Sequence, residues 1–422
     1  MSLSRRILAL SFLCVFAGNF GQSFFVSWFS APIKEDLELS ASAYGGIYSG
    51  ATLISAFCML LVGGLIDRFA LRIFLNVSLF GLLVAAALLA TTTNVLQLFL
   101  GFLALRLFGQ ALLTHTGITT VVKATEPAEL AKRRGRYVSM VGLAIPLGEV
   151  VLPIIAVGLL ATAIWQYSFI VLSGFILLVL FPTANLLLPL RYSHPVQAKN
   201  LAASSRRLDK TAQQTREIAK GRRYAIQDKN FWKALPTVLI AAFVITGVLI
   251  HQDYFLQQEG WTAEMIASVF VLFGIVHGIS TLSGGQLIDR YTALKLFPCI
   301  PLPLILALLA LILFNGTLSL VLMMTGFAIC VGLGSPIVVA LWAEVYGTDY
   351  IGGIRSMVTS FAVWSTAASP FLYGAYIDHF NRPIALSLPD GDNSYIILIC
   401  LNILLCILAF FLAKRAYQHQ ST

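Results

Sequence analysis

Residues 63–68 read Gly-Gly-Leu-Ile-Asp-Arg, and residues 285–290 read Gly-Gln-Leu-Ile-Asp-Arg. The two stretches share five of their six residues, and each separates two long apolar segments of the chain. A match of this kind at equivalent places in the two halves of a sequence indicates an internal duplication. The sequence therefore predicts two related halves, each with this short motif in the same turn.

The segments on either side of the motifs are long enough to cross a membrane. Of 422 residues, 58% are hydrophobic and 11% are charged, whereas soluble proteins average about 25% charged residues. A spanning helix needs about 20 mostly apolar residues. Twelve runs of this kind are predicted: 6–29, 42–62, 72–92, 95–121, 137–161, 164–190, 233–256, 262–284, 294–314, 317–341, 353–377 and 394–413. This pattern excludes a soluble enzyme, a disordered chain and a β-barrel, whose strands would be much shorter and would alternate.

The basic residues give the predicted orientation. The chain has 28 Lys and Arg against 19 Asp and Glu, a net charge of +9. With both termini placed in the cytoplasm, the cytoplasmic segments hold 25 of the 28 basic residues, and the outer loops hold only Lys34 and Arg382. Such a bias follows the positive-inside rule. It accounts for the net charge without a nucleic-acid partner.

The longest hydrophilic stretch divides the chain in the middle. We predict a six-helix bundle over 1–190, a basic cytoplasmic linker over 191–232, and a second six-helix bundle over 233–422. The linker is either an amphipathic helix on the anionic inner leaflet or a solvated connection. No nucleotide-binding loop, catalytic triad, metal-ligand cluster or redox motif is present, so we expect no enzyme activity, cofactor or metal.

The motif resembles the signature of a known family. The major facilitator superfamily of secondary transporters carries Gly-x-Leu-x-Asp-Arg-x-Gly-Arg-Arg between its second and third helices. This chain matches it at Gly63, Leu65, Asp67, Arg68 and Arg72, and departs from it at Ala70 and Leu71. The resemblance extends over essentially the full length of the chain. It implies an all-α membrane protein of 12 transmembrane helices in two pseudo-symmetric six-helix bundles. It also implies alternating access in the inner or plasma membrane.

A second stretch resembles one branch of that family. Residues 342–347, Trp-Ala-Glu-Val-Tyr-Gly, together with Asp378, are similar to the monocarboxylate-porter-like branch. That branch carries an Asp/Arg pair in its eighth helix, which is missing from 262–284.

The resemblance implies a cytoplasmic gate formed by the two motifs. Asp67 would face the start of the span 353–377, and Asp289 would face the start of 137–161. A carboxylate at a helix N-terminus gains about 0.3–1 kcal/mol from the helix dipole. The alternative is that these charges only enforce topology. The predicted gate residues are Gly63, Asp67, Arg68, Arg72, Gly285, Asp289, Arg290 and Arg355.

Two full charges lie near the middle of predicted spans. Arg106 and Glu149 have opposite signs and similar depths, so we predict an ion pair between their helices. Burying each charge costs about 2.5–3.5 kcal/mol on insertion scales, which makes both functional candidates. Either the pair is only structural, or Arg106 binds an anionic group while Glu149 takes up a proton. His277, in the span 262–284, is a second candidate for proton coupling.

Uncharged polar residues extend the candidate site. Gln110 and Thr114 share a helix face with Arg106. In this superfamily helices 1, 4, 7 and 10 line the cavity, so polar residues on these helices are candidate ligands. Polar residues within spans can instead form hydrogen bonds between helices. The predicted substrate-binding set is Asn19, Gln22, Ser23, Arg106, Gln110, Thr114, His251 and Gln252.

These observations predict a secondary transporter that moves a small solute. The preferred hypothesis is a symporter that takes up a small organic anion, similar to a monocarboxylate, together with protons. The alternatives are a proton-coupled exporter of apolar or cationic compounds and a non-transporting receptor on the same scaffold. The expected partners are a small-molecule substrate, the lipid bilayer and protons, with a functional monomer and no nucleic acid.

Overall fold

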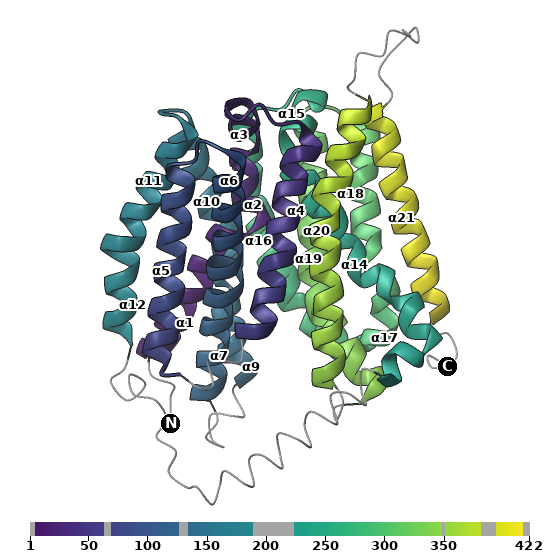
Figure 1. Ribbon diagram of the computed structural model, residues 1–422. Coiled ribbons are helices and arrows are strands. Elements are labelled where there is room, and N and C mark those ends of the chain that lie inside the picture. Colours follow the sequence, from purple (N-terminus) through teal and green to yellow (C-terminus); the bar gives the residue numbers. More distant parts are fainter. Residues whose placement is uncertain are drawn as a thin grey trace, which may run out of the picture. The chain divides into compact units, whose positions relative to one another are not determined.

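The protein is helical throughout the part of the chain that the structure describes. The computed structural model describes residues 5–62, 69–125, 134–188, 223–347, 351–380 and 394–416, and every regular element in these ranges is a helix (Figure 1). Residues 191–222 of the predicted basic linker and the first copy of the repeated motif therefore lie outside the described residues, whereas the last four linker residues, 229–232, belong to α14 (Lys229–Ile250).

The described helices account for the twelve predicted spans. Nine are long and apolar enough to cross a membrane, and a bent pair, Arg5–Gly21 with Ser23–Asp36, adds a tenth among the described residues. Two further long helices, α4 (Ala41–Val62) and α20 (Ile351–Phe380), coincide with the predicted spans 42–62 and 353–377. The nine are α5 (Leu71–Ala90), Val95–Ala124, Arg136–Leu160, Trp165–Leu187, α14 (Lys229–Ile250), α16 (Ala263–Tyr291), Ala293–Leu313, α19 (Thr317–Tyr346) and α21 (Ser394–Ala416).

The chain folds into two compact units. Unit 1 comprises Met1–Gln197 with two short segments from the second half of the sequence, Leu249–Asp253 and Pro370–His379. Unit 2 comprises Ala198–Val248, Tyr254–Ser369 and Phe380–Thr422. The two inserted segments come from the end of α14 with the turn that follows it, and from the last part of α20. Unit 1 therefore contains residues that are more than 200 positions apart in sequence.

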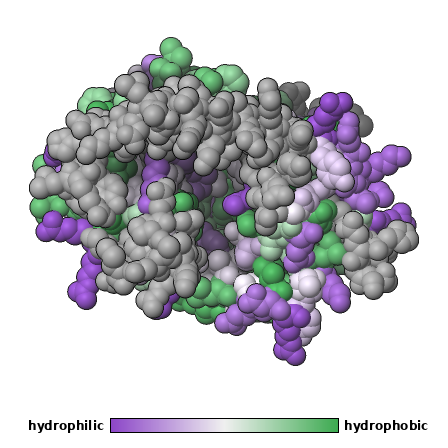
Figure 2. All heavy atoms as spheres, turned by 90° about the horizontal axis from the view of Figure 1, so that it is seen from below, coloured by the Kyte–Doolittle hydropathy of each residue, from purple (hydrophilic) through white to green (hydrophobic). Residues whose placement is uncertain are grey.

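Large apolar side chains cover the sides of the helices. Leu178 and Leu186 are 74% and 77% exposed, and many other Leu, Ile, Val and Phe side chains are also exposed. Such a surface is unfavourable in water and suits lipid chains. On the face seen from below, Figure 2 shows hydrophilic side chains mostly toward the rim, with hydrophobic side chains between them.

The first predicted span is broken in the middle rather than continuous. The α-helix α1 (Arg5–Gly18) tightens into the 3₁₀ turn η1 (Asn19–Gly21), and Gln22 is extended, with φ −80° and ψ 152°. The chain then resumes as α2 (Ser23–Val26), and the two arms are bent by 50°. A Cβ at Gly21 would overlap the Leu105 carbonyl, so glycine lets the break approach the fourth span closely.

The fourth span is distorted at the same place. Between α6 (Val95–Ala104) and α7 (Thr114–Ala124), residues Leu105–Leu113 form a π-helical segment, η4. η1 packs directly on η4. Stretches of π-helix often occur at functional sites, because the extra residue in each turn redirects side chains and frees carbonyl groups.

Several helices in unit 2 are longer than the sequence predicts. The predicted span 262–284 continues to Tyr291 in α16, and 317–341 continues to Tyr346 in α19. The second copy of the motif, Gly285–Arg290, is therefore helical rather than part of a loop. Hydropathy marks only the apolar part of a helix, so it misses polar last turns such as that of α16, where the basic Arg290 is favourable at the helix C-terminus.

Candidate functional site

Arg106 lies at the break of the first span. It projects from η4, is 4% exposed, and donates from Nη1 to the carbonyl oxygen of Gly21 at 3.1 Å. Phe25 N–H, which would bond to Gly21 in a continuous helix, bonds instead to Gln22 O at 3.1 Å. The break therefore frees one carbonyl group, and the buried guanidinium takes it.

An aromatic ring also packs against this guanidinium. Arg106 Cζ lies 5.1 Å from the centroid of the Tyr48 ring on α4, and Tyr48 is fully buried. A guanidinium over an aromatic face is attracted by the ring quadrupole, by about 2 kcal/mol or more where water is excluded. η1, α4 and η4 thus fix the orientation of Arg106 together.

The predicted polar residues on these helices divide into two groups. Gln110 Nε2 donates to Gln22 Oε1 at 2.8 Å, which joins η4 to the break beside Arg106. Asn19 instead donates to Ala144 O at 2.9 Å and packs on Gly148 of α10 (Ala144–Leu160). Thr114 packs on Gly18 of α1, and Ser23 starts α2 half-buried. Arg106, Gln22 and Gln110 therefore come together, while Asn19 and Thr114 pack helices against one another.

The two predicted proton-coupling residues lie in different units. Glu149 is buried on α10 in unit 1, one residue after Gly148, and its pairing with Arg106 stays a prediction. His277 is buried on α16 in unit 2, with its ring centroid 6.0 Å from that of Phe273. Its carbonyl oxygen faces Gly332 of α19.

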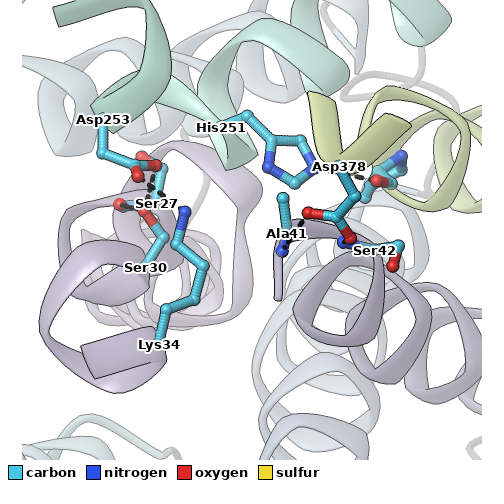
Figure 3. Close-up of polar contacts among 9 residues, drawn as sticks. Ser27, Ser30, Lys34, Ala41, Ser42, His251, Asp253 and Asp378 are labelled. Carbon is cyan, nitrogen blue, oxygen red and sulfur yellow. Dashed lines mark hydrogen bonds and ion pairs between the residues drawn. The ribbon is translucent and has the colours of Figure 1, made fainter. Parts of the chain in front are cut away.

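A polar cluster, here called the clasp, holds the two second-half segments of unit 1 against first-half helices. It consists of Ser27, Ser30, Lys34, Ala41, Ser42, His251, Gln252, Asp253 and Asp378, of which Figure 3 labels all but Gln252. Lys34 Nζ on α3 (Ser30–Asp36) forms an ion pair with Asp253 Oδ2 at 2.6 Å. Ser30 Oγ donates to Asp253 Oδ1 at 3.3 Å, and Ser27 Oγ donates to Gln252 Oε1 at 3.3 Å.

On the other side of the clasp, a carboxylate lies at a helix N-terminus. Asp378 accepts from the backbone N–H groups of Ala41 at 3.0 Å and Ser42 at 2.8 Å, the first residues of α4. Two glycines allow this approach, because a Cβ at Gly45 would overlap the Pro370 carbonyl and one at Gly374 would overlap that of Ala41. The sequence marked Asp378 only as a branch feature. What would have indicated a cap is its position: an acidic residue at the end of one span, where it can accept from the unpaired N–H groups at the start of another span.

His251 and Gln252, predicted as substrate ligands, are engaged inside the clasp. His251 Nε2 lies 2.8 Å from the carbonyl oxygen of Pro370, and the side chain has no exposed surface. Gln252 bonds to Ser27 and is buried. Their contacts join the second-half segments to each other and to the first span.

The predicted cytoplasmic gate is only partly described. Gly63, Asp67 and Arg68 lie outside the described residues, and Arg72 is exposed in the first turn of α5. The remaining four, Gly285, Asp289, Arg290 and Arg355, are exposed on α16 and α20. Arg290 Cζ lies 5.2 Å from the centroid of the Tyr291 ring.

Unit 2 contains a carboxylate cap that the sequence did not indicate. Glu344 on α19 accepts from Ala293 N at 2.8 Å and from Leu294 N at 2.9 Å, where α17 (Ala293–Leu296) begins. It satisfies two N–H groups that a helix start leaves unpaired. Within the described ranges, no three His, Cys, Asp or Glu side chains come together as metal ligands.

Comparison with known proteins identifies the family. Residues 11–370 match the family model described as Major Facilitator Superfamily. Similar solved structures include a bacterial homologue of the human lysosomal transporter Spinster (TM-score 0.72, 14% identity, 99% of each chain), a D-xylose-proton symporter (0.66, 15%, 97% of each) and the nucleoside transporter NupG (0.69, 14%, 98% of this chain and 100% of that one). No curated protein matches the sequence significantly. The protein therefore belongs to the major facilitator superfamily and is an integral membrane secondary transporter, not an enzyme.

Proposed function

We propose that this transporter takes up a small organic anion together with protons by alternating access, and that Arg106 binds the anionic group. The observation that carries this proposal is the burial of Arg106 against the break of the first span. An intramembrane charge is costly, and a helix break at the same depth is typical of substrate sites in secondary transporters.

The described contacts of Arg106 leave donors for a ligand. The bond to Gly21 uses one N–H group, and the guanidinium carbon lies over the ring of Tyr48. A guanidinium has five N–H donors in a planar fork, which suits the two oxygens of a carboxylate. The Gln22–Gln110 amide pair lies beside it and supplies further hydrogen-bonding groups for a polar substituent. Glu149, buried in the same unit, is our candidate for the proton acceptor.

The amide pair also favours a second candidate, the uptake of a neutral hydroxylated solute. Gln22 and Gln110 offer both donors and acceptors, which suit hydroxyl groups better than a single charge does. Two of the similar solved transporters are described as a D-xylose-proton symporter and a nucleoside transporter. In this case Arg106 would be a structural cation.

A ligand screen followed by uptake assays tests these candidates. Purified protein is screened by thermal shift with carboxylates, sugars, amino acids and cationic dyes at two pH values, and hits are assayed in proteoliposomes. We expect carboxylates to stabilise the protein, and Arg106→Gln to abolish their uptake while the protein stays folded. Arg415→Gln, at an exposed residue near the end of α21, is the matched control for loss of one positive charge.

Each contrary outcome has a defined meaning. Unchanged uptake by Arg106→Gln would remove Arg106 from the site, and stabilisation by sugars alone would favour the neutral-solute candidate. Stabilisation by dyes alone, with outward movement, would indicate an exporter. Binding without movement in proteoliposomes would indicate a receptor.

A further inference from the structure

His251 lies between the two charged contacts of the clasp (Figure 3). The Lys34–Asp253 ion pair is on one side of it, and Asp378 at the start of α4 is on the other. It is the first residue after α14, and it lies against the second-half segment that begins at Pro370. Any change in the charge of His251 therefore acts on contacts that hold sequence-distant segments together.

The hydrogen bond of His251 determines which ring nitrogen carries the hydrogen when the imidazole is neutral. The Pro370 carbonyl oxygen can only accept, so Nε2 must carry the hydrogen of this 2.8 Å bond. In a neutral imidazole the other nitrogen, Nδ1, is then without hydrogen. Nδ1 is buried and has no hydrogen-bond partner among the described residues. A proton on Nδ1 would place a charged N–H group in a buried position without an acceptor, which is unfavourable.

The neighbouring charges do not remove this cost. Lys34, Asp253 and Asp378 all act electrostatically on His251, from α3, from α15 (Gln252–Glu259) and from α20. Both carboxylates are already paired, Asp253 with Lys34 and Asp378 with the start of α4. Tyr44 on α4 lies within electrostatic range of Asp253 and is fully buried. Turning either carboxylate toward His251 would break a contact of the clasp.

We infer that His251 is a proton-binding site whose occupation opposes closure of the clasp. The clasp closes on neutral His251. When the clasp opens, Nδ1 reaches water and takes up a proton from the solution. The charge bias predicts that this end faces outside, so the proton would come from the outer solution. This inference rests on the proposed proton coupling and names where the proton first binds.

The sign of the pH dependence follows from linkage. The open clasp binds more protons than the closed clasp, so closure is favoured as pH rises and weakened as pH falls. An imidazole in water titrates near pH 6.5. Below that value, the ratio of open to closed clasp is expected to rise about tenfold per pH unit.

Distance measurements between spin labels test the inference without a substrate. Labels are placed at Thr93→Cys and Gln257→Cys, two exposed positions near the clasp end, in full-length protein whose six native cysteines are replaced. Electron-electron resonance distances are recorded in nanodiscs between pH 7.5 and 5.5. We expect a longer-distance population to grow as pH falls, with the rise beginning near pH 6.5, where the imidazole of the open form takes up its proton.

Two variants separate His251 from other groups. His251→Gln keeps a side-chain N–H for the Pro370 carbonyl but does not titrate, so its distances should be independent of pH and remain those of the closed clasp. His379→Gln removes an exposed histidine of the same end of α20 and should keep the dependence of the unaltered protein. If His251→Gln disturbs folding, His251→Asn provides a second non-titrating variant.

Two outcomes overturn the inference. One is an unaltered protein whose distances do not change with pH, and the other is a folded His251→Gln protein that keeps the full pH response. The proposed anion uptake is tested separately through Arg106. A failed His251 test with successful Arg106-dependent uptake would reject only the proton site, and the reverse result would reject only the substrate assignment.

Discussion

The Arg106 region and the clasp, both in unit 1, hold their charges in different ways. Arg106 is fixed by a backbone carbonyl and an aromatic ring from helices of one continuous stretch of chain. The clasp pairs charged side chains and a helix start from segments more than 200 residues apart. A transporter needs a rigid binding group and contacts that can be released. In the proposed mechanism, the first region would hold the binding group rigidly and the second would supply the contacts that are released.

The packing around the two regions supports this contrast. The break is built into a tight crossing of α1 and η4, where Gly18, Gly21 and Gly109 bring the backbones together. Because these backbones are close-packed, the two helices cannot shift slightly relative to each other without a steric clash. The charged groups of the clasp, Lys34, Asp253 and Asp378, are partly exposed, and contacts of such groups exchange with water at a small net cost. We therefore expect substitutions at the break to affect folding or binding, and substitutions in the clasp to affect the populations of conformations.

The largest expected effect is at Gly21. In Gly21→Ala the new methyl group would overlap the backbone carbonyl of Leu105 and the backbone nitrogen of Gln110, so the first and fourth spans must separate. Overpacking of this kind costs about 1–3 kcal/mol, or more against backbone atoms. We expect a clear fall in the thermal unfolding midpoint in detergent. Gly158→Ala is the control, because a methyl group there meets nothing within 4 Å. Equal midpoints for the two variants would contradict the close crossing.

The next effect is at Tyr48. Tyr48→Leu removes the ring under Arg106, whereas Tyr48→Phe keeps it. A cation–π contact of about 2 kcal/mol in a desolvated site corresponds to roughly 30-fold in affinity. We expect Tyr48→Leu to weaken carboxylate binding by about that factor and Tyr48→Phe to stay close to the unaltered protein. Isothermal titration with the hits of the screen measures both. Loss of binding in Tyr48→Phe would instead make the hydroxyl group the essential part.

These two sites show how far the sequence predicted the molecule. Hydropathy located the spans, because long apolar runs have only one stable arrangement in lipid. It also singled out Arg106, Gln22 and Gln110, since polar groups in such runs are rare. It did not predict the break at Gln22, the π-helical segment at Arg106 or the contact with Tyr48. These depend on how the first, second and fourth spans pack, and no local pattern specifies that.

The clasp illustrates a different limit of the sequence. Lys34 and Asp253 were recognisable as opposite charges near the same membrane face, but nothing in their spacing paired them. The sequence contains Asp378 and Glu344, but nothing in it indicated that either carboxylate caps the start of a helix. A cap requires knowledge of which helix start lies opposite the carboxylate. That information comes only from tertiary structure.

A moderate effect is expected at Asp378. Asp378→Ala leaves the N–H groups of Ala41 and Ser42 without their acceptor and removes a negative charge from the start of α4. Loss of a cap costs about 1 kcal/mol, which corresponds to roughly fivefold in the ratio of open to closed clasp. The spin-label pair described above should report this shift at pH 7.5. Glu264→Gln, at an exposed residue of α16, is the control for loss of a carboxylate near a helix start. A shift of the same size in both variants would contradict a specific role for Asp378.

The smallest effect is expected at the Lys34–Asp253 ion pair. The two side chains are 15% and 18% exposed, so water partly screens the pair, and such pairs contribute about 0.2–1 kcal/mol. Lys34→Ala should therefore move the open-to-closed ratio by less than Asp378→Ala does. The exchange of the two residues, Lys34→Asp with Asp253→Lys, restores opposite charges and should recover most of the closed population. Ser30, which donates to Asp253, would have to turn its hydroxyl hydrogen away and accept from the lysine instead, and this rearrangement sets the upper limit of the recovery. A double variant that stays as open as the single one would mean that Asp253 acts through Ser30 rather than through Lys34.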